Sequence, residues 1–170
     1  MPEIHAFTSI PTKILLPIDF SPSSQAALET AADLAQHFHA ELYLVNIVPL
    51  FPSTTFPDSG PEESFLKEAR SHAERNLAKC RKALAERGVK STSSVEVGND
   101  IAGEIMEVLD REHADMIVIS THGISGWHPL VFGSITHKVV KLAQCPLLLL
   151  HSAKPESGAK TPSDRSMEWW

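Results

Sequence analysis

The sequence has few cysteines and no long apolar run, and each shortage excludes a class of protein. Its two cysteines, Cys80 and Cys145, lie far apart and form no C-x-x-C pair, which argues against a disulfide framework and against a zinc site. No stretch approaches the ~18 consecutive apolar residues of a membrane-spanning helix. The start at Met1 also lacks the basic and apolar regions of a signal peptide. We therefore expect a cytoplasmic protein with no membrane partner.

Basic residues are also scarce relative to acidic ones. Lys and Arg total 15 against 21 for Asp and Glu, so the formal net charge is −6. A nucleic-acid-binding domain usually carries a basic stripe, whereas the longest basic cluster here is the short Lys79-Cys80-Arg81-Lys82. We therefore expect no nucleic-acid partner.

Several signatures of metal and catalytic sites are missing. The nine histidines include no H-x-x-x-H or H-E-x-x-H pair, and the chain has no H-x-G-H, P-loop or G-x-G-x-x-G signature. Beyond Asp19 and His122, no two side chains suggest themselves as a catalytic pair. We expect no metal ligand among the side chains and no catalytic residue.

Strand-like and helical patterns alternate along most of the chain. Apolar or alternating runs of strand length occur at residues 13–19, 41–48, 91–97, 116–120 and 146–151, and amphipathic helical patterns lie between them. This alternation predicts one doubly wound α/β domain over residues 13–151, with a five-stranded parallel sheet and helices on both faces. Residues 1–12 are expected to form a flexible leader, and the polar residues 152–170 a disordered tail.

Glycines gather between the fourth of these runs and the last helical pattern, which begins at Gly133-Ser134. Gly123 and Gly126 can adopt a positive φ and let a ligand approach the backbone. Backbone N–H groups in such a loop, together with the positive end of the helix dipole, favour phosphate. We expect a valine at Gly133 to fill the phosphate space and to need an unfavourable backbone angle. The alternative is that the glycines only form a tight turn.

The spacing of these glycines resembles a known nucleotide-binding signature. Gly123, nine further residues and Gly133-Ser134 match G-x2-G-x9-G-[ST] of the universal stress protein family, except that Ser120 stands where the family has its first glycine. The added side chain of Ser120 could crowd the ribose of a nucleotide. The resemblance implies a Rossmann-like sheet of order 3-2-1-4-5, in which the first and fourth strands are neighbours. Ligands bind at such a switch point.

The resemblance also implies roles for single residues, with ATP and Mg²⁺ as the ligands. Pro17-Ile18-Asp19 would be the family's P-x-D motif that meets the adenine; Ser21-Pro22 caps the next helix, which would leave Asp19 for the ligand. The alternative is that Asp19 is itself a helix cap. Asn46 stands where the family usually has histidine. The residues expected at the nucleotide are Pro17, Asp19, Ile47, Ser120, His122, Gly123, Gly126, Gly133, Ser134 and Ile135.

The last strand carries four leucines in succession, Leu147 to Leu150, without a lysine or proline. An edge strand of this kind is a pairing surface unless something covers it, so we expect a homodimer through it, as the resemblance also implies. Ile4, Phe7 and Ile10 of the leader are the alternative cover. Two functions remain open: an ATP-binding regulatory stress protein that is at most a weak ATPase, or a nucleotide-free member that acts as a dimeric protein-interaction module.

Overall fold

The strands form one parallel sheet with the expected order. The computed structural model describes residues 10–50, 60–121 and 133–151. Within them the strand order is β3-β2-β1-β4-β5, which confirms the predicted fold. The strands are β1 Lys13–Pro17, β2 Glu41–Pro49, β3 Ser91–Gly98, β4 Met116–Ser120 and β5 Leu147–Leu150. Parts of the expected leader and the whole of the expected tail lie outside the described residues.

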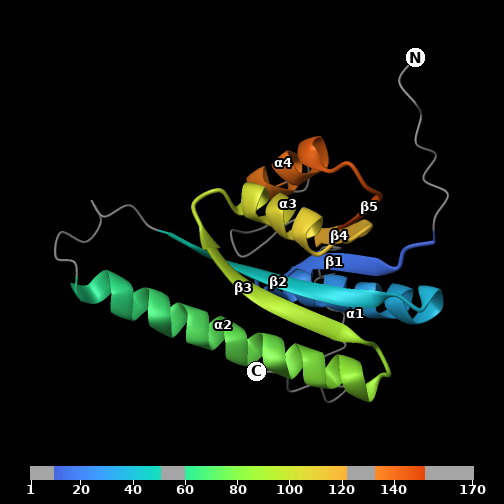
Figure 1. Ribbon diagram of the computed structural model, residues 1–170, viewed down its shortest axis with the longest axis horizontal. Coiled ribbons are helices and arrows are strands. Elements are labelled where there is room, and N and C mark those ends of the chain that lie inside the picture. The colour runs from blue at the N-terminus through green and yellow to red at the C-terminus, as the bar shows by residue number, and fades with distance from the viewer. Residues whose placement is uncertain (1–9, 51–59, 122–132, 152–170) are drawn as a thin grey trace, which may run out of the picture.

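Helices cover both faces of the sheet. They are α1 Pro22–Phe38, α2 Gly60–Glu86, α3 Ile101–Arg111 and α4 Ser134–Leu142. In Figure 1, α1 and α2 lie on one side of the sheet, and α3 and α4 lie on the other. No helix in the described part of the chain is long and apolar enough to cross a membrane.

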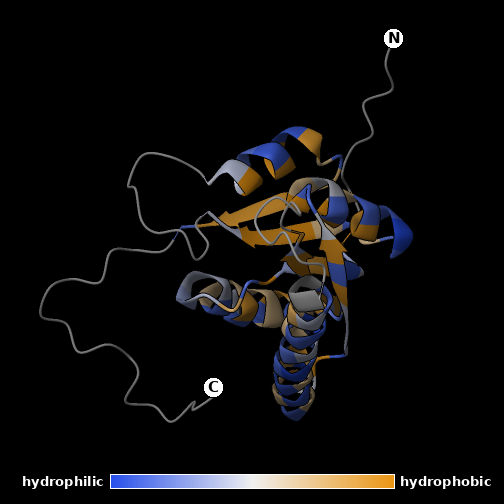
Figure 2. Cartoon of the chain, turned by 90° about the vertical axis from the view of Figure 1, so that its left-hand side faces the viewer, coloured by the Kyte–Doolittle hydropathy of each residue, from blue (hydrophilic) through white to orange (hydrophobic). Residues whose placement is uncertain are grey.

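The central strands are apolar on both faces because each face meets a layer of helices. In β1, Ile14 and Leu16 pack into the core shared with α1 and α2, while Leu15 packs into the core shared with α3 and α4. All three side chains are fully buried. Figure 2 shows the hydrophobic strands enclosed by helices that carry hydrophilic residues.

The chain leaves β1 and β4 in opposite directions. The two strands are neighbours, with Leu15 opposite Ile117. β1 leads into α1 on one face, and β4 leads toward α4 on the other (Figure 1). A crevice forms at the carboxyl ends of two strands that diverge in this way. The topology therefore brings the Pro17-Ile18-Asp19 motif, at the carboxyl end of β1, to the same site as the carboxyl end of β4.

Candidate functional site

A cleft opens at this switch point, with an empty volume of about 570 Å³ that includes space open to solvent. Five of the residues expected at the nucleotide line it: Pro17, Asp19, Ile47, Ser120 and Ile135. Gly133 and Ser134 lie next to it, at the start of α4. His122, Gly123 and Gly126 fall outside the described residues. The other lining residues are Ile18, Ser24, Val45, Asn46, Ile101, Ile105, Ile119 and Thr136.

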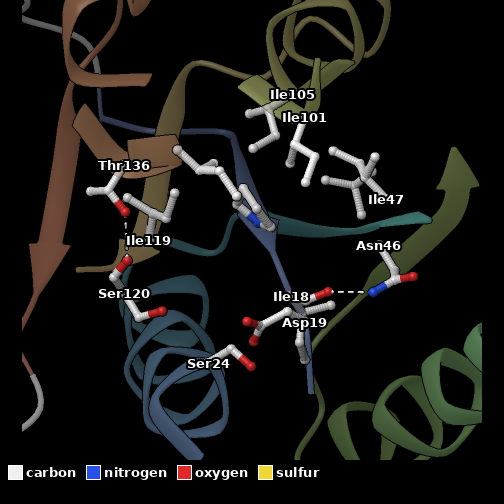
Figure 3. Close-up of a pocket in the computed structure, with 13 residues that line it drawn as sticks. Ile18, Asp19, Ser24, Asn46, Ile47, Ile101, Ile105, Ile119, Ser120 and Thr136 are labelled. Carbon is white, nitrogen blue, oxygen red and sulfur yellow. Dashed lines mark hydrogen bonds between the residues drawn. The ribbon is translucent and has the colours of Figure 1, made fainter. Parts of the chain in front are cut away.

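The two sides of the cleft differ in character. Ile47, Ile101 and Ile105 form an isoleucine wall contributed by β2 and α3. Asp19, Ser24, Ser120 and Thr136 form a polar wall contributed by the ends of β1 and β4 and the first turns of α1 and α4. Figure 3 shows the two groups on different sides, with the Asp19 carboxylate and the Ser24 hydroxyl in the same region.

Sequence reasoning did not assign Ile101 and Ile105 to a site. Their spacing of four residues marked them as part of an apolar helical stripe, which is equally consistent with the core. The distinguishing signal lies in the topology: α3 follows β3 at the carboxyl edge of the sheet, so its first turns lie beside the cleft. Ile105 is 1% exposed, and it belongs to the core as well as to the cleft.

Ser21 is the N-cap of α1, as expected, and Asp19 is hydrogen-bonded to it; that the Asp19 carboxylate also contacts a ligand stays a prediction. The Ser21 backbone N–H donates to Asp19 Oδ1 at 3.0 Å, and the Ser21 hydroxyl donates to the same oxygen at 2.6 Å. The Ser21 hydroxyl in turn accepts from the Ser24 backbone N–H at 3.2 Å. Asp19 therefore fixes the capping residue, and the same carboxylate lines the cleft.

The turn between Asp19 and Ser21 is strained. Phe20 has φ 61°, in the left-handed region that costs a residue with a Cβ about 1 kcal/mol or more. Its side chain packs against the core on the α1 side. The hydrogen bonds of Asp19 to Ser21 close this turn and help to offset its strain.

The end of β4 is joined to the start of α4 by two hydrogen bonds. The Thr136 hydroxyl donates to the Ser120 carbonyl at 3.1 Å, and the Gly133 N–H donates to the Thr121 carbonyl at 3.0 Å. Ser120 and Thr136 are both buried. Thr121 is also bound to β5, because its N–H donates to the Leu150 carbonyl at 2.9 Å. Sequence reasoning missed Thr121 and Thr136, which together hold the two ends of the glycine segment.

The prediction that a side chain at Gly133 would need an unfavourable backbone angle is wrong. Gly133 is the N-cap of α4 with φ −54° and ψ 149°, an extended conformation that any residue adopts at this position. A Cβ added there would lie 3.4 Å from the Thr121 carbonyl oxygen, an ordinary contact. The effect of a larger side chain on a bound phosphate stays a prediction.

The start of α4 is suited to an anion. The first bond within the helix runs from the His137 N–H to the Gly133 carbonyl at 2.9 Å, so the N–H groups of Ser134, Ile135 and Thr136 have no acceptor inside the helix. The first turn carries no acidic side chain. Among residues 10–50, 60–121 and 133–151, no three His, Cys, Asp or Glu side chains are grouped to hold a metal ion.

Residues 11–151 match the model of the universal stress protein family. The chain belongs to this family. It is 33% identical over 144 residues to universal stress protein MJ0531 of Methanocaldococcus jannaschii, a match that covers 85% of this chain and 84% of the relative.

Solved structures of universal stress proteins have the same fold. UspA from Lactobacillus plantarum superposes with a TM-score of 0.74 at 24% identity, over 82% of this chain and 97% of that one. A universal stress protein in complex with cAMP superposes with a TM-score of 0.57 at 21% identity, over 84% of this chain and 98% of that one. At these identities the likeness shows the fold alone.

Proposed function

We propose that this universal stress protein binds ATP with Mg²⁺ in the cleft and acts as a regulatory stress-response module that hydrolyses ATP slowly or not at all. One observation carries the proposal: Asp19 and the start of α4, far apart in the sequence, border one cleft that also has an apolar wall. Ligand sites commonly combine an apolar lining with a few placed polar groups.

The isoleucine wall suits the adenine ring. Ile47 and Ile101 are partly exposed and offer apolar surface on one side of the cleft, beside the buried Ile105, and a planar base would bury a face against this surface. Asp19 lies where its carboxylate could accept a hydrogen bond from a ribose hydroxyl or the adenine amino group.

The start of α4 suits the phosphates. Three backbone N–H groups without acceptors in the helix and the positive end of the helix dipole favour anionic oxygens. Gly123, Gly126 and His122 would complete this end of the site. Mg²⁺ would be held mainly by ATP oxygens and water, because this ion usually binds through substrate phosphates rather than in a cage of side chains.

The solved universal stress protein in complex with cAMP is consistent with nucleotide binding, because cAMP is an adenine nucleotide and that protein shares the fold. Ser120 favours the second candidate, a nucleotide-free protein-interaction module. Its buried side chain lines the cleft where the family has glycine and would reduce the space for ribose.

The two candidates differ in what the purified protein carries. Release of an adenine nucleotide on denaturation, detected by the ultraviolet absorbance ratio and by mass spectrometry, is expected for the first. A protein that releases no nucleotide and shows no thermal shift with ATP would support the second. The cytoplasmic location expected from the sequence stays a prediction.

We also propose a homodimer through β5. β5 ends the strand order, and its four leucines are each only half-buried within one chain. On neighbouring α4, Val140 is 44% exposed and Leu142 is 51% exposed. Ile10 of the leader is 67% exposed, so this residue does not cover the edge. A second copy would pair both edges at once.

Light scattering tests the dimer. At micromolar concentration we expect twice the chain mass of 18.6 kDa. Leu148→Lys should give a monomer, since it would place like charges near the two-fold axis. Leu148 also packs against the core, so a thermal melt must show that the variant is folded. A monomer for the unaltered protein contradicts the proposal.

A further inference from the structure

Asn46 is a buried polar side chain that the site described so far does not use. It lies in β2, lines the cleft and is 9% exposed. Its amide Nδ2 donates to the Ile18 carbonyl oxygen at 2.8 Å, as the dashed line in Figure 3 shows. Burying an amide is costly unless it is hydrogen-bonded, so a polar residue in a strand of apolar neighbours calls for a physical reason.

The acceptor of this bond lies just past the end of the β1 ladder. Pairing between β1 and β2 ends with Pro17 opposite Val45. The Ile18 N–H still donates to the Val45 carbonyl at 2.9 Å, but the Ile18 carbonyl takes its hydrogen bond from the side chain of Asn46. Asn46 thus fixes the peptide group that joins Ile18 to Asp19.

The orientation of that peptide group decides where the Asp19 carboxylate lies. Immediately after Asp19 the chain turns through Phe20 at φ 61°. Ser21 holds Asp19 Oδ1 from the far side of this turn. Asp19 is therefore flanked by two fixed points that are far apart in the sequence: Ser21, the N-cap of α1, and the Ile18 carbonyl held by Asn46 of β2.

We propose that Asn46 is a positioning residue that sets the Asp19 carboxylate for the nucleotide, acting through the Ile18 carbonyl. This inference rests on the proposed nucleotide binding for its effect on affinity. It goes beyond the family resemblance, because this chain has an asparagine where the family usually has histidine. The competing interpretation is that Asn46 only satisfies a buried carbonyl and has no influence on Asp19.

A first experiment needs no ligand. Amide hydrogen exchange is followed by NMR in the unaltered protein and in Asn46→Leu, which is similar in size and has no donor. We expect the Ser21 amide, which donates to Asp19, to exchange about fivefold faster in the variant. The amide of Leu77 in α2 should be unchanged, and Asn46→His, with a ring N–H donor, should restore the slow rate. Asn46→Asp, which also lacks the donor, replaces the leucine variant if that one does not fold. Unchanged exchange at Ser21 overturns the proposal.

A second experiment separates positioning from general stability. Calorimetry with ATP compares Asn46→Leu in the unaltered chain and in an Asp19→Ala background. If Asn46 acts through Asp19, the affinity falls about tenfold in the first background and by less than about twofold in the second. Equal losses in both backgrounds overturn the proposal. If the unaltered protein binds no ATP, the proposed function fails, and hydrogen exchange alone decides whether Asn46 positions Asp19.

Discussion

The two walls of the cleft are built in different ways. The groups of the polar wall stand at sharp changes of chain direction, and hydrogen bonds fix them: the Ser21 hydroxyl donates to Asp19 at 2.6 Å, and the Thr136 hydroxyl donates to the Ser120 carbonyl at 3.1 Å. The isoleucine wall has no such bonds and is placed by the packing of α3 on the sheet. The polar wall is therefore suited to orient a ligand, and the isoleucine wall to bury a ring.

This difference has consequences for mutation. A substitution in the polar wall should remove a directional hydrogen bond, which contributes more to the binding free energy when the group is charged. A change in the isoleucine wall should remove only apolar contact in proportion to area. The following predictions test this contrast, from the largest expected effect to the smallest.

Asp19→Asn should have the largest effect. Asparagine keeps a carbonyl oxygen that can accept from Ser21, but it loses the charge that strengthens a bond to ribose or adenine. We expect ATP affinity to fall by about 2 kcal/mol, roughly 30-fold, in calorimetry. The thermal midpoint should change little. Unaltered affinity would show that Asp19 serves only the cap of α1.

Ile101→Thr should have a smaller effect. Threonine keeps the branched shape but places a hydroxyl in the isoleucine wall. We expect about 1 kcal/mol, roughly fivefold, weaker binding of ATP and the same factor for AMP, because the change lies at the base and not at the phosphates. Ile10→Thr, the same substitution at a residue that is 67% exposed and does not line the cleft, is the matched control and should bind as the unaltered protein does. Equal ATP affinities of the two variants would show that the adenine base does not contact the isoleucine wall.

Ser120→Gly restores the residue typical of the family and tests whether the polar wall is too crowded. Removing the side chain should strengthen ATP binding by about 0.5 kcal/mol, roughly twofold. It should also lower stability by about 0.5–1 kcal/mol, because glycine weakens a strand. Weaker binding in titrations would mean instead that the Ser120 hydroxyl contacts the nucleotide.

Glu96→Gln removes a carboxylate charge, as Asp19→Asn does, but outside the cleft. Burial would raise the pKa of Glu96, yet hydrogen bonds from Arg111 and Ser94 outweigh it and hold that pKa below its ordinary value. The resulting stabilisation is present at neutral pH and is lost as the pH falls through the folded-state pKa. We expect the variant to be less stable by under ~1 kcal/mol at neutral pH, to match the unaltered protein in acid, and to bind ATP equally well. A loss of affinity here would mean that charge changes act on binding from a distance.

The sequence predicted the fold well, and it predicted the polar wall of the site better than the isoleucine wall. Alternating patterns indicated the strands and helices, and the resemblance to the family supplied the strand order. Asp19 lies in the cleft, as predicted. Its hydrogen bonds from Ser21 were not predicted, because they depend on the left-handed backbone of Phe20, which no residue pattern indicates.

In the isoleucine wall Ile47 was predicted, but Ile101 and Ile105 were missed, for a different reason. Periodicity marks a buried face of α3 but not which part of that face extends beyond the core into the cleft. Likewise, the extended backbone of Gly133 follows from its place as a helix N-cap, whereas its residue type suggested a need for positive φ. In both cases tertiary placement decided what local sequence left open.

Calorimetric titration of the unaltered, nucleotide-stripped protein with ATP and Mg²⁺ tests most directly whether the two walls together hold an adenine nucleotide. We predict heat that saturates at one ATP per chain, with a matching rise in the thermal midpoint, because a ligand that binds only the folded state stabilises it. ATP at a concentration on the order of 1 mM lies far above the dissociation constant expected of a functional site. No heat and no thermal shift at that concentration would contradict the proposed nucleotide binding.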